Sequence, residues 1–232
     1  MTASRPSSRQ SAAPSVRLRP VSLREQARDE LRARIVLGQI EPGEVRSVIA
    51  VAEELGVSIT PVREAVMDLA NQGMVEVIRN RGFRVPVLTE HDLDEIYRIR
   101  ALLEAPAMAD VVRVLDGAPV PEFRRLAEEI TEAARAGDLA TFLDKDRQLH
   151  LGLLDLLSNG RLTAMVAQLR DQARMRGLRQ LAARGELTRS GEEHLALVDA
   201  IEAGEAERAV ELMHAHLAHS RGSWAGRPES AS

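Results

Sequence analysis

Hydrophobic residues recur every three to four positions along most of the chain, a spacing that predicts amphipathic helices. In the first third of the sequence this pattern predicts helices over 21–37 and 48–55, and a third helix that starts at Pro61. Gly56 permits a sharp turn after the second helix, because a residue without a Cβ atom adopts a positive φ without strain. The helices on either side of this turn form either a helix–turn–helix or an ordinary helical hairpin. The inward positions of the first and third helices are Leu23, Ala27, Leu31, Ile35, Val62, Val66 and Leu69.

A β-hairpin is predicted directly after the third helix. The β-prone runs 75–78 and 83–85 are separated by a turn that contains Asn80 and Gly82. Arginines lie at or near the tip of this hairpin, among them Arg81. A basic hairpin after a helix–turn–helix is a wing, which can lie along a phosphate backbone.

From Thr89 onward the pattern predicts helices alone. Thr89 is a good N-cap residue and Asp92 stands three positions later, the spacing of a capping box. Consecutive helices with short links predict an antiparallel bundle. The fold class is therefore mainly α, with an N-terminal winged helix–turn–helix, a small β-hairpin wing and a C-terminal antiparallel all-α bundle. The predicted bundle helices cover 89–115, 121–136, 138–157, 161–184, 190–203 and 205–220.

These patterns divide the chain into four regions. Residues 1–20 are rich in Ser, Pro and Arg without periodicity, and we expect a disordered tail. Residues 21–88 form the winged helix–turn–helix domain and residues 89–220 form the helical domain. Residues 221–232 are expected to be a loose C-terminal tail.

Composition narrows the possible classes. The 232 residues include no Cys, which excludes disulfides and thiol catalysis. No apolar run approaches the roughly 20 residues of a membrane span, and the N-terminus lacks the apolar core of a secretory signal. We therefore expect a cytoplasmic protein with no membrane partner. The net charge is −4, yet residues 1–88 carry more basic than acidic groups, which suits a DNA-reading domain on an acidic body.

Polar residues on apolar helix faces are candidate metal ligands. On one predicted helix, Asp146 and His150 stand four positions apart within the inward stripe. His194 and His216 occupy inward positions on the last two helices, at similar distances from the turn between them. Three His and one Asp suit Zn²⁺, Ni²⁺ or Mn²⁺ with coordination positions left open. The alternative is that each His is an ordinary core or surface residue.

Arg100 is an inward-facing charge on the first helix of the bundle. A guanidinium group that faces the interior can grip a carboxylate with two hydrogen bonds. That carboxylate belongs either to Glu104 or a neighbouring helix, which gives a structural salt bridge, or to a small organic acid. Such an acid would also fill the open positions of the metal.

Residues 22–86 resemble the winged-helix domain of the GntR family of bacterial transcription regulators. The resemblance implies binding to double-stranded DNA, with the helix after the turn in the major groove. The expected base or phosphate contacts are Thr60 and Arg63, supported by Ser58, Arg81 and Gly82. Where the family usually has Arg between Ser58 and Thr60 this chain has Ile59, so its operator sequence or affinity can differ from the family norm. The matching residues are Ile35, Gly38, Ile40–Gly43, Ala52–Ser58, Thr60–Ala65, Gly73 and Arg81–Phe83.

The helical region resembles the FCD domain, which follows the GntR head in one branch of the family. The resemblance implies that Asp146, His150, His194 and His216 bind a divalent metal ion. Asn159 is a candidate for the effector pocket beside Arg100, with a helix C-cap as the alternative. The matching residues are Ile96–Glu104, Asp146, His150, Ser158, Asn159, Glu193, His194, Ala200, Ile201, Gly204, Met213, His216 and Leu217.

Together these features predict a metabolite-responsive transcriptional regulator. We expect a homodimer, an operator with an inverted repeat, and a small carboxylate effector that relieves repression, with activation as the alternative polarity. The rival classes are a metal-dependent hydrolase that uses the Asp/His₃ site and an architectural DNA binder that ignores sequence. The hydrolase leaves the helix–turn–helix unexplained and lacks a clearly placed general base.

Overall fold

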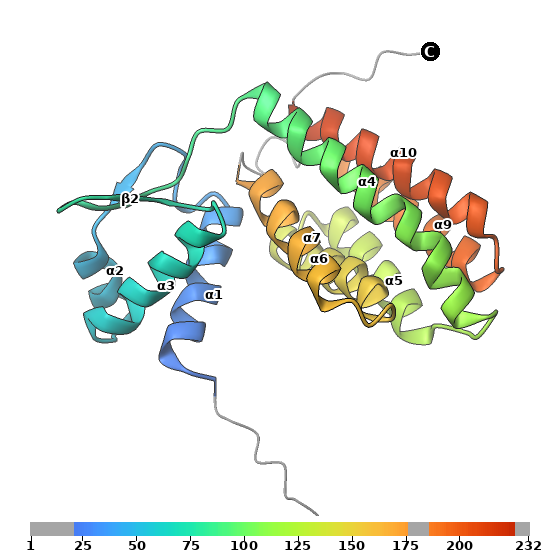
Figure 1. Cartoon of the computed structure of the whole chain (residues 1–232), viewed down its shortest axis with the longest axis horizontal. Helices are drawn as coiled ribbons and strands as arrows, with labels where there is room; N and C mark the ends of the chain where they lie inside the picture. Colours follow the sequence, from blue (N-terminus) through green and yellow to red (C-terminus); the bar gives the residue numbers. More distant parts are fainter. Residues whose placement is uncertain (1–20, 176–185, 226–232) are drawn as a thin grey trace, which may run out of the picture.

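A computed structural model of the chain describes residues 21–175 and 186–225. It contains an N-terminal head, made of α1–α3 and β1–β3, and a larger helical body that begins at α4 (Figure 1). The predicted mainly α fold class is therefore confirmed. The tail predicted over 1–20 and the end of the helix predicted over 161–184 lie outside the described residues.

The helices of the head form the predicted helix–turn–helix. They are α1 (Leu23–Val36), α2 (Val48–Leu55) and α3 (Ile59–Asn71). Gly56 ends α2 with a φ of 65°, the left-handed conformation that the turn requires. The sequence predicts that α3 starts at Pro61, but the helix starts at Ile59 and Pro61 is its third residue. The missing N–H of Pro61 is still tolerated, because N–H groups of the first helical turn have no intrahelical acceptor. The inward position predicted for Leu23 is wrong: its side chain is 52% exposed, because it lies on the first turn of α1, at the edge of the packed face.

A three-stranded antiparallel sheet completes the head, with the strand order β1-β3-β2. β2 (Glu76–Ile78) and β3 (Gly82–Arg84) form the predicted hairpin, whereas β1 (Val45–Arg46) is a strand that the sequence does not predict. Gly82 has a φ of 124°, and a Cβ atom at this position would lie 1.9 Å from the Arg46 carbonyl oxygen. Glycine is therefore required where β1 meets the wing.

The body is built from consecutive helices, of which α10 packs along α4 and α5 packs against both α6 and α9 (Figure 1). The capping box predicted at Thr89 and Asp92 is present at the start of α4. The last helix continues beyond its predicted end at 220, so the tail predicted over 221–232 is helical at its beginning. The described helices of the body are α4 (Glu90–Leu115), α5 (Pro121–Ala136), α6 (Leu139–Asp155), α7 (Gly160–Arg174), α9 (Glu186–Glu202) and α10 (Ala206–Ala225).

Aliphatic side chains fill most of the core, because aromatic residues make up only 2% of the chain. The three Phe residues, Phe83, Phe123 and Phe142, are all buried. One continuous cluster of buried apolar side chains extends from α1 in the head to α10 in the body. Among the helices within 21–175 and 186–225, none combines the length and apolar character that crossing a membrane would require.

The head touches the body at the C-terminal end of α7. The side-chain amide of Gln172 donates a hydrogen bond to the Gln72 backbone carbonyl, just after α3, at 2.7 Å. Arg32 of α1 lies close to Asp171, with 3.4 Å between Nη1 and Oδ1. A Cβ atom at Gly73 would lie 2.5 Å from the Gln172 side-chain nitrogen, so glycine at 73 leaves room for this contact.

Candidate metal centre and DNA-facing surface

The start of α3 is turned outward from the head. Ser58, Thr60 and Arg63 are all exposed, as DNA contacts must be. Ser58 is the N-cap residue of α3, yet its hydroxyl makes no capping hydrogen bond and so stays available to a partner. The opposite face of α3 is anchored in the core by Val62, Ala65, Val66 and Leu69.

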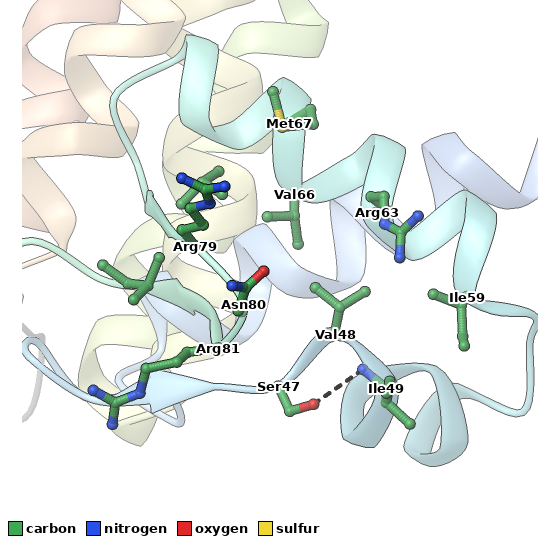
Figure 2. Close-up of a pocket in the computed structure, with 13 residues that line it drawn as sticks. Ser47, Val48, Ile49, Ile59, Arg63, Val66, Met67, Arg79, Asn80 and Arg81 are labelled. Carbon is green, nitrogen blue, oxygen red and sulfur yellow. Dashed lines mark hydrogen bonds between the residues drawn. The ribbon is translucent and has the colours of Figure 1, made fainter.

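A hollow of about 400 Å³ lies between the start of α2, the outer face of α3 and the tip of the wing (Figure 2). Arg63, Arg81 and Gly82 line it, so the structure brings together three of the predicted contacts from two separate elements. Ser58 and Thr60 are not among the lining residues, although they lie on the same exposed start of α3.

Three guanidinium groups around this hollow have no acidic partner in the described part of the chain. They belong to Arg63, Arg79 and Arg81, all of which are exposed. Arg84, also on the wing, differs from them because it pairs with Glu76. The three unpaired guanidinium groups are available to phosphate oxygens and base edges.

Asp146, His150, His194 and His216 meet inside the body. Asp146 and His150 come from α6, where their spacing places them on one helix face, while His194 comes from α9 and His216 from α10. All four side chains are buried, and one ligand atom of each lies within 4.8 Å of the others. The structure therefore brings together, from three helices, the four residues that the sequence predicts as metal ligands.

The distances between these ligand atoms suit a single ion. The Nε2 atoms of His150 and His194 are 3.1 Å apart. The Asp146 Oδ1 atom lies 3.2 Å from the His194 Nε2 and 3.7 Å from the His150 Nε2. Atoms that bind one metal ion at about 2.1 Å stand roughly 3.0–3.4 Å apart in octahedral or tetrahedral sites. The donor set and the 3.1 and 3.2 Å spacings thus fit a bound divalent metal, and the 3.7 Å spacing would have to shorten slightly around the ion.

Two of the three His rings interact through Nδ1 with an oxygen outside the centre, whereas the Nδ1 of His150 has no hydrogen-bond partner among the described residues. An interaction of this kind fixes the ring orientation and leaves the Nε2 lone pair directed at the centre. The pairs are His194 with the Ser190 carbonyl oxygen at 2.6 Å and His216 with the Glu193 Oε2 at 2.9 Å. The Glu104 Oε2 lies 3.5 Å from the His150 Nδ1, close enough for charge attraction but without a hydrogen bond.

Burial keeps two of the imidazoles neutral. It lowers the pKa of His150 well below its ordinary value, and the positive charge of Arg170 adds to this effect. Burial also lowers the pKa of His216, to about 4, with a contribution from His194. The neutral imidazole is the form that binds a metal, so no proton competes at neutral pH.

Two arginines of α7 hold the carboxylate of Asp146. Arg170 and Arg174 both donate to its Oδ2 atom, which leaves Oδ1 directed at the His side chains. Burial alone would raise the pKa of Asp146, but the two guanidinium groups outweigh burial and hold the pKa well below its ordinary value. The carboxylate is therefore ionised, as a metal ligand must be.

Sequence reasoning misses Arg170 and Arg174. The one feature of the sequence that could have indicated their burial is their spacing of four positions, which places them on the same face of α7 as the buried Val166 and Ala173. Arginines on a helix normally extend to solvent, so this spacing alone does not indicate burial.

Arg100 extends the ionic network to α4. It is only 4% exposed, and its Nε donates to the Glu104 Oε1 at 2.6 Å. Glu104 also accepts a hydrogen bond from Arg170 at 2.9 Å. The sequence leaves Glu104, a neighbouring helix and a small organic acid open as partners of Arg100. The structure shows the salt bridge with Glu104. A space of about 30 Å³, enough for one water molecule, lies among Arg100, Arg170, Arg174 and the metal-ligand cluster.

Asn159 does not reach this site. It is exposed at the N-cap of α7, where its side-chain oxygen accepts a hydrogen bond from the Leu162 backbone N–H at 3.2 Å. It is also absent from the residues that line the space beside Arg100. The C-cap alternative is wrong, because Leu156 is the C-cap of α6 and the Asn159 amide caps the start of α7.

An outward-facing α3 with a basic wing, joined to an all-helical body with a buried Asp/His group, defines a DNA-binding regulator with a second, all-helical domain. The chain belongs to the GntR family of bacterial regulatory proteins, whose DNA-binding region matches residues 23–85, and it carries an FCD domain over residues 95–219. It is therefore a transcriptional regulator and not an enzyme, and the members of its family bind DNA operators.

Relatives with known names support this assignment. The transcriptional regulator McbR of Escherichia coli is 33% identical over 153 residues, which cover 66% of this chain and 69% of McbR. The solved structure of McbR has a TM-score of 0.77 at 29% identity and covers 86% of this chain and 95% of that chain. A relative from Paenarthrobacter nicotinovorans, named "Probable D-xylose utilization operon transcriptional repressor", is 31% identical over 89% of this chain and 90% of its own length.

The body also matches the fold of a solved FCD domain that is described as metal-free. That domain has a TM-score of 0.51 at 20% identity and covers 60% of this chain and 94% of its own, so the likeness concerns the fold alone. FCD domains are known to bind metal ions, and this chain has a buried Asp/His group of the kind such binding needs.

Proposed function

We propose that the protein is a repressor whose affinity for operator DNA is controlled by a small organic acid bound at a metal centre. Asp146, His150, His194 and His216 would hold the ion, for which Zn²⁺, Ni²⁺ and Mn²⁺ are the candidates. The observation that carries the proposal is the convergence of these four buried ligand groups within 4.8 Å. A bound ion supplies positive charge and open coordination positions to an anionic ligand.

Three guanidinium groups favour a carboxylate as that ligand. Arg100, Arg170 and Arg174 border the space beside His216, and planar guanidinium groups bind carboxylates through paired hydrogen bonds. The space holds about one water molecule, so an acid of several carbons can enter only if these side chains separate. Effector binding would therefore change the positions of the arginines.

Neighbouring residues of α7 face the cluster and the head. Arg170 and Arg174 bond to Asp146, while Asp171 and Gln172 contact the head. An acid that draws the two arginines away from Asp146 would shift α7 and the contacts that it makes with the head. We propose α7 as the element with two positions, of which effector binding favours one.

The regulator is proposed to act as a homodimer on an inverted repeat. A symmetric dimer presents two copies of α3 that are related by a two-fold axis, as the half-sites of a palindromic operator are. In each half-site the proposed contacts are Ser58, Thr60, Arg63, Arg81 and Gly82. The polarity is proposed as repression because a repressor is named among the relatives.

Operator binding by the full chain tests this function. Protein loaded with Zn²⁺, Ni²⁺ or Mn²⁺ is titrated with operator DNA in the presence of a panel of mono-, di- and tricarboxylates, and fluorescence anisotropy gives the Kd. At least one acid should weaken binding by about 5–150-fold, and only when metal is present. His216→Ala should abolish this response, whereas the control His214→Ala, at an exposed position of the same helix, should retain it. No response to any acid, or an equal response in His216→Ala, would contradict the proposal.

A further inference from the structure

Large apolar side chains are exposed around the DNA-facing hollow. Ile49 of α2, Ile59 and Met67 of α3 and Val77 of β2 line it, and they are between 39% and 56% exposed. None of them belongs to a core cluster of the described residues. A single exposed apolar residue is ordinary, but several around one hollow indicate a surface that contacts a partner.

The charges of the hollow identify that partner as DNA. Arg63, Arg79 and Arg81 line the same hollow and have no acidic partner among the described residues. Figure 2 shows Ile59 and Arg63 extending from the same part of α3, with Ile49 near them on α2. Phosphates satisfy the guanidinium groups but offer nothing to an isoleucine. The apolar side chains therefore need an apolar group on the DNA itself.

The major groove of B-DNA presents one apolar group, the C5-methyl of thymine. Ile59 is the first residue of α3, at the helix end that a helix–turn–helix inserts into that groove. It stands four positions before Arg63 and so shares its face of the helix. We infer that Ile59 contacts a thymine methyl in each operator half-site and is a specificity-determining residue. The inference rests on the proposed placement of α3 in the groove and is independent of the metal centre.

The other apolar residues of the hollow are less well placed for this contact. Met67 lies eight positions after Ile59, about 12 Å further along α3 and away from the inserted end. Ile49 belongs to the first helix of the motif, which crosses the backbone rather than entering the groove. Val77 lies on the wing. Ile59 is therefore the residue to test.

The test uses the full chain and an operator selected from random duplex DNA. Each thymine of one half-site is replaced in turn by deoxyuridine, which removes only the methyl group. At one thymine the affinity of the wild-type protein should fall about 3–5-fold, the effect expected for one methyl group that is no longer buried. Ile59→Ala should bind the thymine and uracil operators equally. The control Leu23→Ala replaces an exposed apolar residue of α1 outside the hollow and should retain the full uracil penalty.

A second pair of bases at the same position tests the methyl contact without relying on the overall affinity of the variant for DNA. Cytosine in place of the critical thymine should weaken binding, and 5-methylcytosine should restore part of it for the wild-type protein but not for Ile59→Ala. The inference is overturned if the wild-type protein is indifferent to uracil at every thymine. It is also overturned if Ile59→Ala retains the uracil penalty. Failure to enrich any sequence would instead overturn the DNA-reading function on which the inference rests.

Discussion

The contact between α7 and the head predicts a variant that uncouples effector binding from DNA binding. Gln172→Ala removes the side-chain amide that donates to the Gln72 carbonyl at 2.7 Å, together with one methylene group. A hydrogen bond of this kind contributes about 0.5–1.5 kcal/mol, which corresponds to roughly a 2- to 12-fold change in an equilibrium constant. Arg32 and Asp171 contribute less, because their closest atoms are 3.4 Å apart and Arg32 is partly exposed. We therefore expect Gln172→Ala to reduce the effector-dependent change in operator affinity about 2- to 12-fold.

The assay compares the operator Kd of metal-loaded protein with and without the acid that gives the largest response. The ratio of the two Kd values should be smaller for Gln172→Ala than for the wild-type protein. Gln168→Ala is the matched control, because Gln168 lies one turn earlier on α7 and makes no side-chain hydrogen bond within the described residues. This control should keep the wild-type ratio.

Equal ratios in the wild-type protein and Gln172→Ala would show that the position of the head does not depend on this hydrogen bond, contrary to the prediction. A loss of response in both glutamine variants would assign the effect to the stability of α7 instead. Thermal unfolding of the two variants separates these outcomes, because the control should lose response only if its helix is destabilised.

Three further variants test other parts of the structure. Gly82→Ala should separate β1 from the wing, because its Cβ would meet the Arg46 carbonyl oxygen at 1.9 Å. We expect Gly82→Ala to lose about 1–3 kcal/mol of unfolding free energy and to bind the operator more weakly at unchanged metal content. An unchanged operator affinity would contradict the role of Gly82 in joining β1 to the wing. Asp146→Asn leaves the buried guanidinium group of Arg174 without its anion and that of Arg170 with Glu104 alone, and it should lower the unfolding free energy in urea by about 3–5 kcal/mol, so a neutral effect would argue against the buried network. Thr89→Ala should cost about 1 kcal/mol at pH 7 through loss of the N-cap of α4, measured by thermal unfolding. Hydrogen bonds from Thr89 hold the pKa of Asp92 below its ordinary value of 3.8. The part of the stabilisation that depends on the Asp92 carboxylate is therefore complete above that pH and is lost as the pH falls through the lowered pKa. The difference between Thr89→Ala and the wild-type protein should therefore shrink in acid, and a constant difference would count against the capping box.

Much of the fold was predictable because local signals agree with the tertiary structure. The helix predicted over 121–136 is α5, since Pro121 opens it and Gly137 adopts the left-handed conformation that ends it. Asp146 and His150 were also recognisable, because a carboxylate and an imidazole on an otherwise apolar stripe are costly unless they are paired or bind an ion.

Other features depend on contacts that no local pattern encodes. β1 has two residues, and it is a strand only because β3 pairs with it from almost forty positions along the chain. Arg170 and Arg174 can be buried because carboxylates on other helices pair with them, Asp146 with both and Glu104 with Arg170. Asn159 lies in the short link between two predicted helices, where an Asn can cap either the end of one helix or the start of the next. In the structure Ser158 has the positive φ and Asn159 is the N-cap of α7.

The metal content of the purified full chain is the decisive test of the proposed metal centre. The protein is incubated with Zn²⁺, Ni²⁺ or Mn²⁺, desalted, and analysed by inductively coupled plasma mass spectrometry, with circular dichroism to confirm that each variant is folded. We expect close to one ion per chain in the wild-type protein and in His214→Ala, and almost none in His194→Ala, whose buried imidazole belongs to the four-residue cluster. A wild-type protein that retains no ion, or a His194→Ala variant that retains a full complement, would contradict the proposed metal centre.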